Sequence, residues 1–213
     1  EPAPRSSHVV CSALIELLSH KNWQVRGRAT AALGRAAPMA DVATSLRLAE
    51  CLEDQAAGVR SQVPEALEAL MGGTKGSDVA MEAVRRRLSN PKWPVRQAAI
   101  TAMARIAQSC DADAIAVLAA MMQDEVASVR DAAIQTLAMI APRGDAGLVA
   151  VLADGVTSRD PNVRATALVA LGNLANRGQM DALELAKRGL KDRSPMVRTK
   201  AAEAIGHLAG DEV

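Results

Sequence analysis

The chain has 213 residues, of which 49% are hydrophobic, so it carries ample apolar surface for a core and gives little reason to expect disorder. Only 1% are aromatic, from two Trp without Phe or Tyr, which disfavours a β-sandwich or barrel and removes the stacking platforms of single-stranded nucleic-acid binders. The formal net charge of +1 excludes a global field that would steer the protein toward nucleic acid, anionic membranes or acidic substrates.

The dipeptide Val-Arg recurs six times, at intervals of 34 or 36 residues. Apolar residues stand 4, 8 and 11 positions after each valine, and 7 and 11 positions before it. Offsets of 0, 4, 8 and 11 lie on one face of an α-helix, so each interval predicts a hairpin of two helices. We call the helix with the Val-Arg pair the second helix of its repeat. The valines are Val25, Val59, Val95, Val129, Val163 and Val197.

In chain order, the repeats are expected at residues 7–40, 41–76, 77–110, 111–144, 145–178 and 179–213, as a single array over residues 1–213. First helices are expected to begin eighteen residues before the valine, at Ser7, Asp41, Ser77, Asp111, Asp145 and Gln179. Five of these six side chains are good N-caps. Asp160-Pro161 and Ser194-Pro195 place a capping residue before a proline at the start of a second helix. The predicted fold is all-α, an α-solenoid forming a right-handed superhelix of six two-helix repeats.

The 36-residue interval, from Val59 to Val95, has two residues more than the others. They fall in Gly72-Gly73-Thr74-Lys75-Gly76, between repeats. An insertion there leaves the helical faces intact. A glycine-rich stretch with a lysine also suggests phosphate binding. We disfavour that interpretation because the order G-x-x-x-x-G-K-[ST] is absent and the stretch follows a helix.

The pattern D-x-x-x-x-V-R-x-x-A-x-x-A-L-G-x-L-A resembles the HEAT repeat, in the short form of HEAT-like proteins of the phycobilisome-lyase type, over residues 7–209. In HEAT proteins the aspartate and the arginine belong to a ladder of hydrogen bonds between successive turns, so the resemblance implies a structural role for them. The alternative is a row of arginines that binds anions, which the adjoining aspartates would weaken. The implied ladder residues are Arg26, Arg60, Arg96, Arg130, Arg164, Arg198, Asp54, Asp124 and Asp192, with His20, Asn90 and Ser158 in place of the other aspartates.

A catalytic function has little support in the sequence. His8, His20 and His207 lie far apart, no Cys/His or His/Asp cluster has metal-ligand spacing, and no familiar catalytic fingerprint occurs. We therefore predict no catalytic, cofactor-binding or metal-binding residue and expect that the protein is not an enzyme. Some short HEAT-like proteins are bilin lyases, so the resemblance keeps a lyase-like or chaperone activity as an alternative.

A binding surface is expected on the second helices, which line the concave side of HEAT arrays. Positions 2, 6 and 10 after each valine point away from the buried stripe. The surface they form is mixed and short-chained, without a basic stripe, and suits a protein or peptide better than a phosphate backbone. Trp23 and Trp93 are interpreted as lids on the hairpin core, with anchoring of a partner as the alternative. The predicted partner-binding residues are Arg35, Glu65, Gln97, Thr101, Arg105, Asp131, Gln135, Met139, Asn173, Glu203, His207, Trp23 and Trp93.

The sequence thus predicts a non-catalytic scaffold or assembly subunit that binds a partner protein, with a nucleic-acid-associated HEAT function as a further, disfavoured alternative. Cys11, Cys51 and Cys110 are interpreted as buried free thiols of a reducing intracellular compartment, either cytoplasm or an organelle matrix or stroma. No run is long enough to span a membrane. The run Arg85-Arg86-Arg87 is expected on a solvated face.

The first helix, around Val9–Leu18, is apolar on nearly all sides with a single charge. Such a helix is normally covered, so we expect the N-terminal face to pack against more chain, a partner subunit or a second copy. The chain itself is expected to be processed or part of a longer protein, because it opens at Glu1 without an initiator Met.

Overall fold

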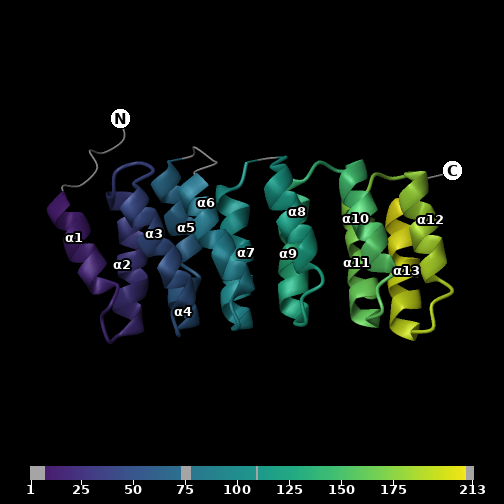
Figure 1. The fold of residues 1–213 in the computed structure, drawn as a ribbon, viewed down its shortest axis with the longest axis horizontal. Coiled ribbons are helices and arrows are strands. Elements are labelled where there is room, and N and C mark those ends of the chain that lie inside the picture. Colours follow the sequence, from purple (N-terminus) through teal and green to yellow (C-terminus); the bar gives the residue numbers. More distant parts are fainter. Residues whose placement is uncertain (1–7, 73–77, 109, 210–213) are drawn as a thin grey trace. The chain divides into compact units, whose positions relative to one another are not determined.

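The computed structural model describes residues 8–72, 78–108 and 110–209. Within these ranges the chain folds into α-helices and two short 3₁₀ segments, and no strand is present (Figure 1). The predicted all-α solenoid of helical hairpins is confirmed. The helices group into two compact units, residues 1–108 and 109–213.

The first unit contains the first three hairpins. Its first helices α3 and α6 pack on each other, and its second helices lie in a row in which α5 contacts both α2 and α7. Two first helices end in a 3₁₀ segment, η1 and η2. In chain order the elements are α1 (His8–Leu17), α2 (Trp23–Ala36), α3 (Val42–Glu50), η1 (Cys51–Glu53), α4 (Ala57–Arg60), α5 (Val63–Met71), α6 (Asp78–Arg85), η2 (Arg86–Ser89) and α7 (Trp93–Ile106).

The second unit repeats this two-layer arrangement with three regular hairpins. First helices α8 and α12 both contact α10, and second helices α9 and α13 both contact α11. Each unit therefore presents one layer of first helices and one of second helices. The elements are α8 (Ala112–Met121), α9 (Ala127–Ile140), α10 (Ala146–Val156), α11 (Pro161–Leu174), α12 (Met180–Gly189) and α13 (Pro195–Leu208).

The second helix of the second repeat departs from the periodic pattern. It is divided into α4 and α5, with a turn at Ser61 and Gln62 between them. Pro64 stands at the start of α5. A proline inside a helix lacks the N–H for the usual bond and crowds the carbonyl four residues earlier, here that of Arg60, so the helix restarts.

The columns of apolar residues form the core. Eight residues after the valine, Leu33, Leu67, Met103, Leu137 and Leu171 are fully buried, whereas Ile205 in the last repeat is half-buried. Leu190 was expected to point inward, and this prediction is wrong: its side chain is 42% exposed. It caps the end of α12, where no later hairpin of the described chain covers it.

The starts of the helices largely follow the sequence. Asp41, Asp111 and Asp145 accept hydrogen bonds from the first-turn N–H groups of Thr44, Ala114 and Leu148, as predicted for N-caps. Asp160 caps α11 in the same way. Ser194 occupies the N-cap position of α13, but its side chain makes no capping bond, contrary to the prediction. Ser7, Ser77 and the stretch 73–76 lie outside the described residues.

The linkers between repeats bind the C-terminal end of the next second helix, at the end of the hairpin away from its turn. In four linkers one residue adopts a positive φ, which turns its N–H toward the next repeat. That N–H donates to a carbonyl in the last turn of the next second helix, which has no partner inside its own helix. The bonds are Ala40 to Leu70 at 3.0 Å, Cys110 to Ile140 at 2.8 Å, Gly144 to Leu174 at 2.8 Å and Gly178 to Leu208 at 2.7 Å.

The three cysteines are free, as predicted, but they are not all buried. Cys11 is buried and Cys51 is half-buried, whereas Cys110 is exposed. The prediction for Cys110 is wrong because this residue lies in a linker, with a φ of 65°, and not in a helix.

Candidate protein-binding surface

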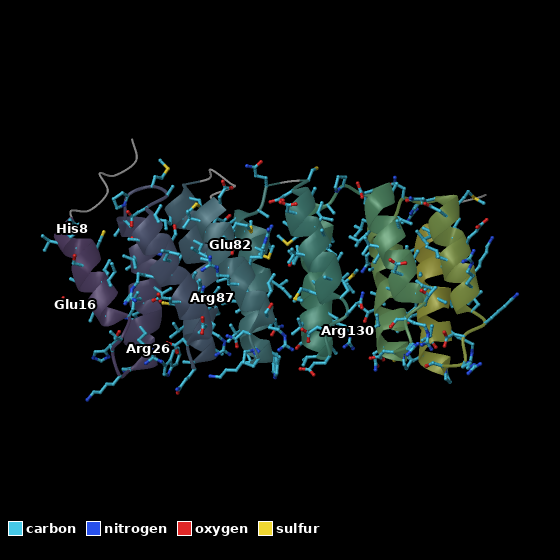
Figure 2. All side chains as sticks on the ribbon, viewed as in Figure 1. His8, Glu16, Arg26, Glu82, Arg87 and Arg130 are labelled. Carbon is cyan, nitrogen blue, oxygen red and sulfur yellow. The ribbon has the colours of Figure 1, made fainter. Side chains whose placement is uncertain are left out.

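The arginine after each repeat valine closes the turn of its own hairpin. In all six repeats its Nη1 donates to the backbone carbonyls six and five residues earlier. Arg26, for example, binds the carbonyls of His20 and Lys21 at 2.8 and 3.2 Å, at the turn between α1 and α2 (Figure 2). One guanidinium thereby satisfies two turn carbonyls that would otherwise need water. The column is Arg26, Arg60, Arg96, Arg130, Arg164 and Arg198.

Two of these arginines also join their repeat to the next one. Nε and Nη2 of Arg26 donate to the two carboxylate oxygens of Asp54, at 2.6 and 2.8 Å. Arg164 binds Asp192 in the same way, at 2.7 and 2.8 Å. These are bidentate, charge-assisted pairs. Each aspartate in addition accepts the N–H two residues on, from Ala56 or Ser194, and so orders the start of the following second helix.

Arg130 makes its link to the next repeat differently. The position equivalent to the aspartate is Ser158 in that repeat, and Nε of Arg130 instead donates to Oγ1 of Thr166, on α11, at 3.1 Å. Arg130 is only 7% exposed, and Arg96 only 8%. Asp124 is half-buried and accepts the N–H of Val126. The arginine column is therefore engaged with the protein's own backbone and side chains.

The Arg164–Asp192 pair should make the stability depend on pH. The bonds from Arg164 hold the pKa of Asp192 at about 2, below its ordinary value. Because the folded pKa is the lower one, the stabilisation is complete above the unfolded pKa of about 4 and disappears as the pH falls toward 2. We expect Asp192→Asn to lower the free energy of unfolding by about 1 kcal/mol at pH 7, with a smaller loss at pH 3. Urea unfolding at several pH values measures this. Asp131→Asn, at an exposed position, is the control, and a loss independent of pH would contradict the assignment.

In the first unit, the predicted partner-binding residues lie on neighbouring second helices. Arg35, Glu65 and Thr101 are exposed, and Gln97 and Arg105 are half-buried. Nη1 of Arg105 on α7 donates to Oε2 of Glu68 on α5, at 3.1 Å. The sequence analysis missed Glu68. It stands nine residues after its repeat valine and Arg105 stands ten residues after the valine of the next repeat, so the opposite charges at these adjacent positions could have predicted the pair.

In the second unit, all the predicted residues are exposed, and they lie on α11 and on its neighbours α9 and α13. Along α11 itself only Asn162 and Asn173 are exposed. The outward positions two and six residues after Val163 hold short side chains, Ala165, which is buried, and Val169, which is half-buried. Nδ1 of His207 on α13 lies 3.2 Å from where a Cβ on Gly172 would stand. The imidazole therefore lies against α11 at Gly172, the residue before Asn173. The exposed residues are Asp131, Gln135 and Met139 on α9, Asn173 on α11, and Glu203 and His207 on α13.

Trp23 covers part of the next repeat and is also accessible. Its ring packs on Gly58, where an added Cβ would stand 2.9 Å from Cε3, so a larger residue there would displace the indole from this position. At the same time 47% of Trp23 is exposed, and 44% of Trp93. Trp23, Arg28 and Gln62 line an open hollow of about 500 Å³ at this end of the second helices. The two interpretations of Trp23, lid and anchor, are thus compatible.

The run Arg85-Arg86-Arg87 was predicted to be solvated, and this is wrong for Arg87. Its side chain is 15% exposed, and its Nε lies 3.1 Å from Oε1 of Glu53 in the preceding repeat. Arg86, the first residue of η2, is exposed and pairs with Glu82 on α6. The end of the first helix turns into η2, which rotates Arg87 toward η1.

No helix in the described part of the chain is long and apolar enough to cross a membrane. Among the same residues, no three His, Cys, Asp or Glu side chains come together as a metal site would require.

Comparison with known families agrees with the repeat geometry. The family model for HEAT repeats matches residues 11–104, 48–138 and 147–213. This chain belongs to the HEAT-repeat family. The match is to HEAT repeats in general and does not confirm the phycobilisome-lyase type. A comparison with curated proteins finds no match.

Three solved structures are similar to this chain. An engineered protein is 22% identical, with 93% of this chain and 98% of that chain covered and a TM-score of 0.50. A designed armadillo repeat protein in complex with the peptide (KR)4 is 15% identical, with 95% and 100% covered and a TM-score of 0.50. An archaeal HEAT-like repeats protein from Thermococcus onnurineus NA1 is 15% identical, with 93% and 86% covered and a TM-score of 0.47. At these identities the similarity shows the fold alone.

Proposed function

We propose that this HEAT protein is a non-catalytic scaffold or assembly subunit that binds a partner protein through the exposed face of its second helices. The observation that carries the proposal is the surface around α11. Exposed polar and flexible side chains on α9 and α13 flank a floor of short side chains on α11. Such a floor lets a polypeptide approach the helices closely, while the flanking side chains supply hydrogen bonds and adaptable packing. The similar designed armadillo protein was solved with a bound peptide, and we propose binding of the same general kind here.

The bonds of the arginine column weaken the nucleic-acid alternative. A phosphate backbone needs exposed, clustered cations along the binding face. All six arginines of the column direct Nη1 to carbonyls of their own turns, and Arg26, Arg130 and Arg164 make further bonds to the next repeat. A bilin-lyase-like or chaperone activity stays an alternative that rests on the sequence resemblance.

The free thiols of Cys11, Cys51 and Cys110 support our further proposal that the protein works in a reducing intracellular compartment.

Substitutions on α9 test the proposed surface. Met139 is 63% exposed and Gln135 is exposed one turn earlier. Partners are first identified by cross-linking and mass spectrometry, and the affinity of the purified partner is then measured. Because truncation or charge at a central contact costs at least about 1–2 kcal/mol, we expect Gln135→Arg with Met139→Glu to weaken binding about tenfold or more.

The matched control is Ala120→Glu with Gln123→Arg, which adds the same charges to exposed positions at the other layer of the same unit. This pair should change the dissociation constant by less than about twofold. Equal weakening by both pairs, or none by the α9 pair, would rule out the second-helix face as the binding surface.

We also propose that the outer face of α1 is covered in the functional protein, by more chain, a partner subunit or a second copy. Val9, Val10 and Leu17 are 75%, 42% and 40% exposed, while the polar side chains along the helix are Ser12 and, labelled in Figure 2, His8 and Glu16. Hydrogen exchange of α1, measured in the isolated chain and in the native complex, tests this: protection should rise in the complex, and strong protection in an isolated monomer would argue against it.

A further inference from the structure

A basic hollow lies at the turn end of the second unit. It has a volume of about 480 Å³ and lies between the turn that precedes α11 and the end of α12. Arg159 comes from the turn, Arg188 from the last turn of α12, and Lys191 and Arg193 from the segment that follows. The remaining charged groups lining it are the Arg164–Asp192 pair, so the hollow carries five cations and one carboxylate.

The four basic residues outside the Arg164–Asp192 pair are not neutralised by a carboxylate of the described chain. All four are exposed, and in the part of the chain that the structure describes none of their side chains forms an ion pair. Asp192, the carboxylate that lines the hollow, accepts one bond from Arg164 on each oxygen and a further bond from the N–H of Ser194. The backbone carbonyls of Arg159 and Arg193 accept bonds from Arg164 and Arg198, so the main chain that carries these two side chains is held in place.

Apart from Asp192, the carboxylates next to these cations in the described chain, Asp160 and Glu184, do not line the hollow. Asp160 follows Arg159 in the turn and uses its Oδ1 to cap α11, through the N–H of Asn162. Glu184 is exposed one turn before Arg188 on α12. Neither forms an ion pair with the basic residues of the hollow in the described structure, so the positive charge there is only partly offset.

The first unit contains an equivalent hollow of the opposite charge. It lies at the turns of the first two repeats, has a volume of about 300 Å³, and includes Asp54 of the equivalent Arg26–Asp54 pair. The positions of Arg188 and Lys191, nine and six residues before the repeat valine, are occupied there by Glu50 and Glu53.

The two carboxylates of the first unit are paired. Glu50 binds Arg47 at 2.7 Å, and Oε1 of Glu53 lies 3.1 Å from Nε of Arg87. An equivalent turn with the same bidentate pair thus accommodates carboxylates at the positions where the second unit has cations without an ion pair. The fold therefore does not require Arg188 or Lys191 to be basic.

We propose that the basic hollow binds an acidic segment, rich in Asp and Glu, of a partner protein. Several fixed cations around one hollow attract a run of carboxylates more strongly than isolated surface charges do. The aromatic residues of the chain are Trp23 and Trp93, and neither is among the described residues that line the hollow, so it lacks the stacking surface that single-stranded nucleic acid uses. This site is separate from the second-helix face of the proposed function, and the two can be tested independently.

The test uses the full chain and a fluorescein-labelled peptide of alternating Glu and Ser, about twelve residues long, with the Gln-Ser peptide as its neutral match. Binding is measured by anisotropy at about 0.05 M salt, where exposed charges are weakly screened. The variant Arg188→Glu with Lys191→Glu introduces the residues that the first unit has at these positions, so it should fold normally. We expect it to weaken binding of the acidic peptide at least about tenfold, with no measurable binding of the neutral peptide to either protein.

The control is Lys21→Glu with Lys187→Glu, which changes the net charge by the same amount at exposed positions that do not line the hollow. It should leave the affinity within about threefold. If the control weakened binding of the acidic peptide as much as Arg188→Glu with Lys191→Glu does, the loss would come from the net charge of the protein alone, and the proposal would be wrong. An oligonucleotide of about twelve nucleotides is the third arm: if it binds more tightly than the peptide and depends on Arg188 and Lys191, the site is a nucleic-acid site and the proposal is wrong. Failure of the acidic peptide to bind the parent protein would also overturn it, and would leave the second-helix proposal untouched.

Discussion

Leu137→Ala is expected to lower the free energy of unfolding of the second unit by about 2–5 kcal/mol. Leu137 is fully buried, in the column eight residues after the repeat valine, and lies in the middle of α9. Truncation removes apolar contacts and leaves a cavity that the helices fill only by moving closer. In a solenoid each repeat is stabilised mainly by its neighbours, so a loss in one hairpin also weakens its interface with the next.

Urea unfolding followed by circular dichroism measures the loss. Met139→Ala is the matched control, because this side chain lies on the same helix and is 63% exposed, and its truncation should cost less than about 0.5 kcal/mol. If Leu137→Ala lowered the free energy of unfolding by no more than Met139→Ala does, about 0.5 kcal/mol, the assignment of the buried column would be wrong.

Gly34→Ala is expected to destabilise the first unit by about 1–3 kcal/mol, although alanine is the better helix former. A Cβ at this position would stand 2.6 Å from Cα of Ala66, on the next second helix. Because the obstacle is backbone, the two helices must separate. Gly206 occupies the same column in the last repeat, nine residues after the valine, and a Cβ there meets nothing within 4 Å.

Gly206→Ala is therefore the control, and its sign should be opposite: a gain of up to about 1 kcal/mol from helix propensity. Gly172, where the added Cβ would stand 3.1 Å from Cα of Ala204, should fall between the two. Thermal unfolding of the three single variants gives the order directly. Equal effects at Gly34 and Gly206 would show that the close approach of α2 and α5 is not what requires glycine.

The sequence by itself predicted the hairpins and their buried faces because both depend on residue spacing within one helix. Offsets of 4, 8 and 11 from each valine place Leu137 and its equivalents on the inward face of their helix, and those in the first five repeats are fully buried. Capping by Asp41, Asp111 and Asp145 was predictable for the same reason, since an N-cap bond spans three residues. The link from Arg26 to Asp54 was expected from the HEAT resemblance, and its geometry is bidentate.

The tertiary structure decided which residues of different repeats meet. The linker bonds from Gly144 and Gly178 depend on where the next second helix ends, thirty residues later. Arg130 binds Thr166 because stacking brings α11 beside it, and neither residue type alone indicates the other. The charge of each hollow is set in the same way. Arg159 and Lys191 are 32 residues apart and read as ordinary solvated side chains in their own helices and turns. Only the stacking of two hairpins, driven by the buried columns, places their charges around one hollow.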